Sequence, residues 1–429
     1  MSRAEALGRN VLWFTLLVSL AGFLGYYDAD GFVAPPPVIV LGLQVVGGLL
    51  AAVLLRDRLI PSLRGIVPLL LVAVWAAATL MWADDPVTAM RRWVLVFAPG
   101  LLLCALAASD PRPRQTFVWF AGVVVVIVVA SGIFSGIVVV FWETTIADSA
   151  LRYFLLDLGG WQAGISEGGR QYSITTIPRE PVLYIPRYSG LTSNPNSLSL
   201  FAAIATIALG AYAPWKKSAK RYAWILLAAL VVFVLLLSGS RAAVGMAVIG
   251  ILCVFLLQSG RHNVARVLIV LILGAAAALY ISAWFTASAP DPEQLEVFQL
   301  RGRAEAWRLA MLGLQDIWPT GFGFGLTEEV VYRPLGLQTA AHSLALTSLL
   351  EIGVIGFALI LFAWFQPVFR ATRTAGENSP LQVAIVALLM GLFVHQVVDS
   401  SVFRYHWAHF VFVYLIGASA GLSGSRTSE

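Results

Sequence analysis

The chain has little charge. Charged residues make up only 12% of its 429 residues, whereas hydrophobic residues make up 59%. A soluble globular domain is nearer a quarter charged and half apolar. The surplus of apolar residues has to face something other than water, and the segments between the apolar runs leave no soluble domain of useful size. The composition therefore excludes an ordinary soluble protein.

Cysteine and the common cofactor motifs are also scarce or missing. The two cysteines, Cys104 and Cys253, lie inside apolar runs and form no CxxC motif or Cys/His cluster, so we interpret them as small packing residues. No GxxxxGK[ST], GxGxxG or HExxH motif occurs, which leaves nucleotide and zinc-protease chemistry without support. We therefore expect neither a cofactor nor a metal.

Long apolar runs are what the chain has instead. About 20 apolar residues are enough to cross a bilayer as a helix. The runs lie near residues 11–26, 37–55, 66–82, 93–108, 116–142, 192–214, 222–238, 242–258, 264–286, 343–365, 381–398 and 405–422. We predict an all-α integral membrane fold in which residues 1–429 form a single polytopic domain of about twelve transmembrane helices. The first run lacks a small-x-small cleavage site before Tyr26, so we interpret it as a retained helix.

The loops predict the orientation. With a cytoplasmic N-terminus and strict alternation, the inside segments hold 16 of the 28 basic residues and 5 of the 23 acidic residues, so the inside is +11 and the outside is −6. This is the asymmetry of the positive-inside rule, and it predicts that both termini are cytoplasmic. Because the positive charge is spread over short loops, we expect membrane lipids as neighbours and no nucleic-acid partner.

Two long segments, residues 143–191 and 287–342, fall on the outer face. In the second, apolar residues recur at spacings of three and four: Ala304, Trp307, Met311 and Leu314. This spacing predicts a short amphipathic helix within 301–318, followed by a sharp break at GFGFG, 321–325. We expect such helices to cover a cavity at the outer leaflet.

Arginines gather on this outer face, where an ionisable group beside a bilayer is a functional candidate. They are Arg187, Arg241, Arg301, Arg303 and Arg308. Guanidinium groups bind phosphate oxygens in forks and stay charged, so a diphosphate site is one interpretation. The alternatives are that Arg241 snorkels to the interface, that Arg187 anchors the chain before a helix cap, and that the other three form a solvated face.

The outer face also carries histidines. His342 opens an apolar helix and is either a general base, since its intrinsic pKa near 6.5 suits proton removal from a hydroxyl, or a boundary histidine bonded to backbone. His395 and Asp399 are an i,i+4 pair near the last outer turn, with His406 and His409 following. Their spacing matches no strong metal signature, and we favour a network in which Asp399 holds one of the arginines.

Outer arginines, a histidine base and an outer-leaflet cavity fit one chemistry. A lipid-diphosphate-linked sugar donor is bound through its phosphates, an acceptor hydroxyl is deprotonated and attacks the anomeric carbon, and the lipid diphosphate leaves. Arginines can neutralise that leaving group without a metal.

Four motifs in order then resemble a known family. They are RYSGLTSNPN, LSGSRAAV, R-x-x-x-W with a following PTGFGFG, and AHSLALTSLLEIGVIG, and together they cover roughly residues 185–360. Their order is similar to that of the O-antigen ligase and polymerase superfamily of integral membrane glycosyltransferases, with a GT-C-like arrangement of helices. The best match is O-antigen ligase.

The resemblance implies transfer of O-antigen polysaccharide from undecaprenyl diphosphate to a sugar of lipid A–core, at the periplasmic face of the bacterial inner membrane, without metal and with inversion. It implies that His342, Arg241 and Arg303 are catalytic, and that Arg187 holds the diphosphate. We add Asn196, Arg301, Arg308 and the weaker match Asp399 as substrate-binding candidates. We expect a monomer.

Rival functions stay open. An O-antigen or exopolysaccharide polymerase would use the same donor, although many such relatives lack a histidine at the position of His342. A protein O-oligosaccharyltransferase usually has a larger C-terminal region than the roughly eight residues expected after the last span here. A transporter or flippase also has about twelve helices, but it keeps charges near the midplane and often shows internal repeats.

Overall fold

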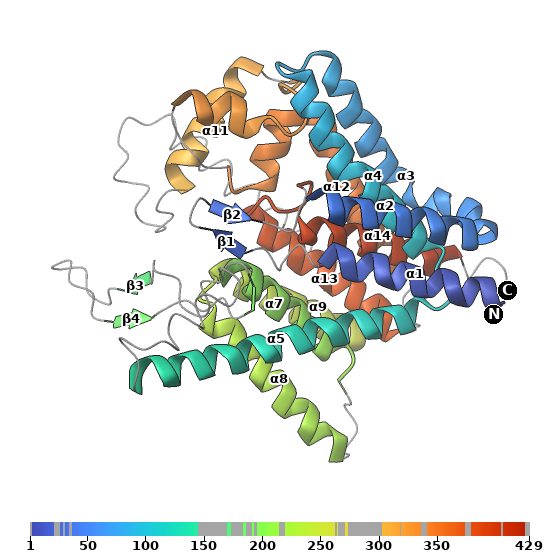
Figure 1. The fold of residues 1–429 in the computed structure, drawn as a ribbon, viewed down its shortest axis with the longest axis vertical. Coiled ribbons are helices and arrows are strands. Elements are labelled where there is room, and N and C mark those ends of the chain that lie inside the picture. The colour runs from blue at the N-terminus through green and yellow to red at the C-terminus, as the bar shows by residue number, and fades with distance from the viewer. Residues whose placement is uncertain are drawn as a thin grey trace.

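The computed structural model describes residues 2–20, 26–28, 31–33, 37–144, 170–172, 183–185, 191–192, 195–213, 219–261, 264, 271–272, 303–317, 319–335, 341–373, 379–404 and 406–424. Long helices dominate these residues (Figure 1). The helices are α1 (Arg3–Leu20), α2 (Pro37–Leu54), α3 (Arg56–Ala78), α4 (Pro86–Ala108), α5 (Pro113–Thr144), α7 (Pro195–Ala211), α8 (Ala219–Leu237), α9 (Arg241–Gln258), α11 (Arg303–Ile317), α12 (Leu344–Arg373), α13 (Pro380–Val397) and α14 (Trp407–Gly424).

Short elements complete the described fold. Two antiparallel hairpins pair β1 (Tyr26–Asp28) with β2 (Gly31–Val33), and β3 (Arg170–Tyr172) with β4 (Leu183–Ile185). The 3₁₀ turn η2 (Thr79–Met81) extends α3, and the π-helical turn η4 (Glu328–Tyr332) runs into the 3₁₀ turn η5 (Arg333–Leu335).

Seven of the described helices are long and apolar enough to cross a membrane, and three shorter apolar helices accompany them. The chain is therefore a multi-pass helical membrane protein. The expected total of about twelve spans stays a prediction. Each predicted apolar run overlaps a described helix except 264–286, which lies almost wholly outside the described residues.

Several helices begin earlier than the apolar runs. α3 begins at Arg56 rather than near residue 66. Arginine has a high helix propensity although it is polar, so the helix extends beyond the apolar run. α4 begins at Pro86 rather than near residue 93, because Asp85 caps it: the Asp85 side chain accepts the Thr88 amide at 3.0 Å, and proline suits the first helical position. Hydropathy marks the membrane-buried part of a helix, whereas caps mark its ends.

Contacts at one end of the bundle bring three of the predicted inside segments together. Glu5 in α1 pairs with Arg58 at 2.8 Å. Arg9 donates to the Gln115 side chain at 2.6 Å, and the α14 residue Ala420 is packed against Gly65. The start of α1 and the end of α14 therefore lie at the same end, opposite α11 and the hairpins (Figure 1).

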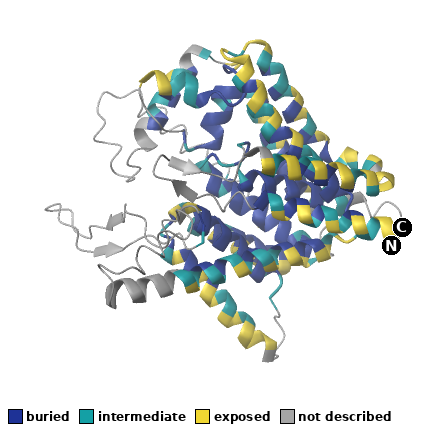
Figure 2. Cartoon of the chain, viewed as in Figure 1, coloured by how far each residue is buried: buried dark blue, intermediate teal, exposed yellow. Residues whose placement is uncertain are grey.

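Glycines bring the central helices close together. A Cβ atom on Gly391 of α13 would lie 2.7 Å from the Met246 carbonyl oxygen of α9, and one on Gly421 of α14 would lie 2.8 Å from the Ala108 carbonyl oxygen of α4. Without a hydrophobic driving force between helices in lipid, small residues that allow backbones to approach are what makes such packing favourable. α7, α13 and α14 are largely buried in the bundle (Figure 2).

Large apolar side chains cover the periphery. Val53, Val74 and Leu226 are 68%, 65% and 72% exposed, and exposed residues line the outer sides of α2, α3 and α8 (Figure 2). An apolar surface this extensive would be a liability in water, whereas hydrocarbon chains accommodate it. The polar and charged contacts described below lie instead at the end of the bundle opposite the start of α1 and the end of α14.

Candidate active site

Two of the candidate binding residues, Arg241 and Asn196, lie at helix starts. Arg241 is the first residue of α9 and is exposed, directly after a tight turn in which Gly239 has a φ of 64° and the Ser238 hydroxyl donates to the Leu235 carbonyl at 2.6 Å. Asn196, exposed, is the second residue of α7. Free amides at a helix start favour anions. Arg187 and Arg301 lie outside the described residues.

α11 confirms the amphipathic pattern at 301–318. It runs from Arg303 to Ile317, and Trp307, Met311 and Leu314 are buried. Arg303 is its first residue. Arg308 is half-buried. The R-x-x-x-W motif thus consists of an arginine at the start of α11 and, one turn later, a buried indole that packs the helix against the protein.

A small apolar cluster brings α11 against the start of α12. Trp307 and Met311 belong to it with Ala341, Leu346 and Leu350. The Tyr332 hydroxyl also donates to the Ala306 carbonyl at 2.8 Å. Two of the predicted motifs, R-x-x-x-W and AHSLALTSLL, therefore meet in space, whereas Arg241 and Asn196 belong to helices of the larger core.

His342 lies immediately before α12 and is half-buried. Its φ of 46° is in the left-handed region, which few residues other than glycine adopt. The neighbouring Ser343 caps the helix: its hydroxyl accepts the Leu346 amide at 3.3 Å, and its carbonyl accepts the Thr347 amide at 3.0 Å. This backbone conformation places His342 directly before the capped start of α12.

α12 is broken at Gly353, where φ is 68° and ψ is −171°. The break leaves three carbonyls without their helical partners, and each finds another donor. The Leu350 carbonyl accepts the Phe322 amide at 2.9 Å, the Glu351 carbonyl accepts the Gly323 amide at 3.0 Å, and the Ile352 carbonyl accepts the Trp75 indole at 2.8 Å. The GFGFG segment and α3 therefore hold the end of a short first helix segment that begins just after His342.

The sequence did not identify the partners of the Glu351 side chain. Its side chain is 3% exposed, and its Oε1 atom lies 2.9 Å from Arg404 Nη2. The same oxygen accepts the Thr327 hydroxyl at 2.7 Å and the Thr327 amide at 3.3 Å. The sequence showed an acidic residue in an apolar run, but its partners are 24 residues before it and 53 residues after it, so no local pattern could have revealed them.

A second ion pair lies nearby. Arg92 donates to Glu329 Oε2 at 2.6 Å, contacts the other carboxylate oxygen and also bonds the Gly325 carbonyl. Burial alone would raise the pKa of Glu329, but the hydrogen bond and charge of Arg92 outweigh it, and the pKa lies below its usual value. The pair fastens the start of α4 to the segment that follows GFGFG.

The histidines at the turn between α13 and α14, which the sequence predicts as the last outer turn, have structural roles. The His406 ring accepts the Ala408 amide at 3.2 Å and thereby caps α14. Burial lowers the pKa of His406 to about 4; the charge of Asp399 opposes this effect, and that of His395 adds to it. His409 bonds the Phe403 amide and the Val96 carbonyl. Asp399 itself is half-buried, and its predicted pairing with an arginine stays a prediction.

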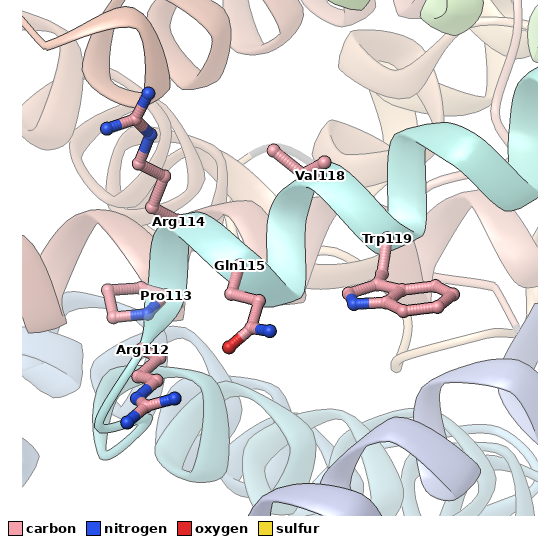
Figure 3. A pocket seen from close by; sticks show the side chains of 6 residues that line it. All are labelled: Arg112, Pro113, Arg114, Gln115, Val118 and Trp119. Carbon is pink, nitrogen blue, oxygen red and sulfur yellow. The ribbon is translucent and has the colours of Figure 1, made fainter.

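A hollow of about 580 Å³ lies far from these residues, at the opposite end of the bundle. Residues at the start of α5 line it: Arg112, Pro113, Arg114, Gln115, Val118 and Trp119 (Figure 3). Arg112 and Gln115 point to one side of the helix and Arg114 to the other (Figure 3). None of the predicted site residues lines it.

The fold defines a helical membrane protein, and the Glu351–Arg404 and Arg92–Glu329 ion pairs lie at the end that carries the candidate residues. Residues 226–361 match the family model of O-antigen ligase. This segment of the chain is therefore similar to the O-antigen ligase family. It contains Arg241, Arg303 and His342. No curated protein matches the chain.

Proposed function

We propose that the chain is an O-antigen ligase that transfers polysaccharide from undecaprenyl diphosphate to a sugar hydroxyl of lipid A–core. The proposal places the reaction at the periplasmic face of the bacterial inner membrane, with both termini cytoplasmic. The observation that carries it is the family match over 226–361, because this segment contains all three residues proposed as catalytic.

His342 is the proposed base. Its ring takes the proton from the acceptor hydroxyl, the resulting oxygen attacks the anomeric carbon, and the bond to the diphosphate breaks on the opposite face, which inverts that carbon. The constrained backbone of His342 before the capped start of α12 supports this role, since a base must stay within hydrogen-bond reach of the proton it removes.

Arg241 and Arg303 are proposed to bind the diphosphate, with Arg187 as a third cation. Arg241 and Arg303 are each the first residue of a helix. Forked hydrogen bonds from guanidinium groups, added to the positive end of a helix dipole, stabilise the negative charge that grows on the leaving group. Asn196, Arg301, Arg308 and Asp399 are proposed to contact the donor or the acceptor.

Reconstituted transfer tests the proposal. Purified protein is incubated with an undecaprenyl-diphosphate-linked glycan and lipid A–core, without added metal, and the products are separated by mass. Glycosylated lipid A–core supports the ligase. Longer glycans on the carrier alone would overturn it in favour of a polymerase.

A variant tests the base. His342→Ala should lower the transfer rate by about 10²–10⁴-fold, the usual contribution of general base catalysis. Arg370, which is exposed on α12, gives a control on the same helix in Arg370→Gln, which should keep the wild-type rate. Unchanged transfer in His342→Ala would remove His342 as the base.

A further inference from the structure

The carboxylate of Glu351 joins three segments that are distant in sequence. It belongs to the first segment of α12, it accepts two hydrogen bonds from Thr327 after GFGFG, and it faces Arg404 on the turn between α13 and α14. The turn that carries Arg404 also carries Asp399 and the helix-capping His406. The ion pair therefore connects the helix that follows His342 to the last outer turn.

Glu351 acts on His342 only through the helix between them. Nine residues separate the two, about 14 Å along a helix at 1.5 Å per residue, so the side chains do not touch. The first segment of α12 is short, however, and it ends at the break at Gly353. A rotation of this segment about its axis would swing its start, and the His342 ring with it.

Directional bonds are needed to fix that rotation. Apolar packing against Trp307 and Met311 is non-directional. The hydrogen bonds to the Leu350, Glu351 and Ile352 carbonyls fix the backbone at the end of the segment, and the Glu351 side chain adds directional contacts to two further segments. The bonds from Thr327 and the charge of Arg404 approach a single oxygen of Glu351 from two different segments. A buried ion pair is weak evidence for stability, but it can specify one arrangement among similar ones.

We propose that Glu351, held by Thr327 and Arg404, is a positioning residue that sets the orientation of His342 for the acceptor hydroxyl. The catalytic part of this inference rests on the proposed function. Glu351 touches no substrate in this account. It sets the orientation of the His342 ring. Through Arg404 it also sets the position of His342 relative to the turn that carries Asp399.

Glu351→Gln is the main test. Glutamine keeps the size and one acceptor oxygen for Thr327 but removes the charge that faces Arg404. We expect kcat to fall about 10²-fold, the loss typical of a reacting group misplaced by about 1 Å, with the KM for the lipid-diphosphate donor unchanged. The matched control is Glu5→Gln, which removes the Glu5–Arg58 pair at the opposite end of the bundle and should keep wild-type kinetics.

The partner residues refine the test. If the pair acts as a unit, Glu351→Gln/Arg404→Gln should lose no more activity than either single variant. Thr327→Val removes one hydrogen bond to the same oxygen, should reduce kcat less, and replaces Glu351→Gln if that variant does not fold. Wild-type kcat in a folded Glu351→Gln or Thr327→Val protein would overturn the proposal, as would a loss confined to donor KM.

A chemical readout separates this inference from the proposed function. Diethyl pyrocarbonate modifies histidine rings, and mass spectrometry gives the rate at His342 without any turnover. We expect Glu351→Gln to change that rate several-fold and Glu5→Gln to leave it unchanged. A wild-type protein that transfers no glycan would defeat the proposed function, whereas an unchanged modification rate in Glu351→Gln would defeat the positioning role.

Discussion

A Cβ atom on Gly353 would overlap the carbonyl oxygen of Pro319. The two segments cross where α12 breaks, and the Val354 amide donates to that same carbonyl at 3.0 Å. The crossing extends two residues further along each segment, because a Cβ on Gly321 would lie 2.7 Å from the Glu351 carbonyl oxygen. Glycine is thus required on both segments for the GFGFG loop to reach the end of the first part of α12.

Gly353→Ala should therefore destabilise the protein. The backbone angles of Gly353 are in a region that is essentially restricted to glycine, at a cost of about 1–3 kcal/mol for other residues, and the overlap with Pro319 adds to this. We expect a lower melting temperature in detergent. Gly122→Ala, in α5, where an added Cβ would meet nothing within 4 Å, is the comparison, and an equal effect of both changes would contradict this account.

Arg92→Met should loosen the segment after GFGFG. It leaves the Glu329 carboxylate partly buried without its main hydrogen-bond donor, at a cost of about 1–3 kcal/mol. Because Arg92 lowers the pKa of Glu329 in the folded state, the stability from this pair is present above the unfolded pKa near 4.5 and is lost as pH falls through the folded value. Melting curves at several pH values should show wild type and Arg92→Met converging in acid.

The sequence predicted some of these features and missed others for a physical reason. The apolar runs, the α11 periodicity and the inside loops depend on local residue order, and the Glu5–Arg58 and Arg9–Gln115 contacts agree with the grouping of those loops. The ion pairs of Glu351 and Arg92 link residues 53 and 237 positions apart. Such pairs depend on tertiary packing, which one sequence does not reveal.

The same limit applies to the turn between α13 and α14. The sequence showed a group of histidines and an aspartate, which left a network and a metal site as alternatives. In the structure, His406 caps α14, and the His409 ring forms hydrogen bonds with the Phe403 amide and the Val96 carbonyl. The roles follow from backbone amides and carbonyls within reach of each ring, and residue type alone does not specify these neighbours.

His406 gives a prediction about acid. The folded pKa is about 4 and the ordinary value is 6.5, so between these values the unfolded chain takes up a proton that the folded chain does not. Stability should then fall as pH decreases from about 6.5 to about 4 and level off below that range. Protonation of the ring nitrogen would also remove the acceptor of the Ala408 amide.

His406→Asn is the variant for this test. Asparagine is a good helix cap and does not titrate, so its melting temperature should depend less on pH over the same interval. Isothermal denaturation of both proteins at pH 7, 6 and 5 would measure the difference. Parallel pH dependence in wild type and variant would show that other groups are responsible.

Arg241→Lys examines the diphosphate site directly. Lysine keeps the positive charge at the start of α9 but lacks the planar fork that binds two phosphate oxygens. If Arg241 binds the leaving diphosphate, kcat/KM for the donor should fall about 10–100-fold, the effect of losing about 1.4–2.8 kcal/mol of transition-state stabilisation. Because Arg241 is exposed, the melting temperature should not change. Arg221→Lys, an exposed arginine near the start of α8, is the matched control. Equal kinetics in the two variants would mean that Arg241 only anchors the helix at the interface.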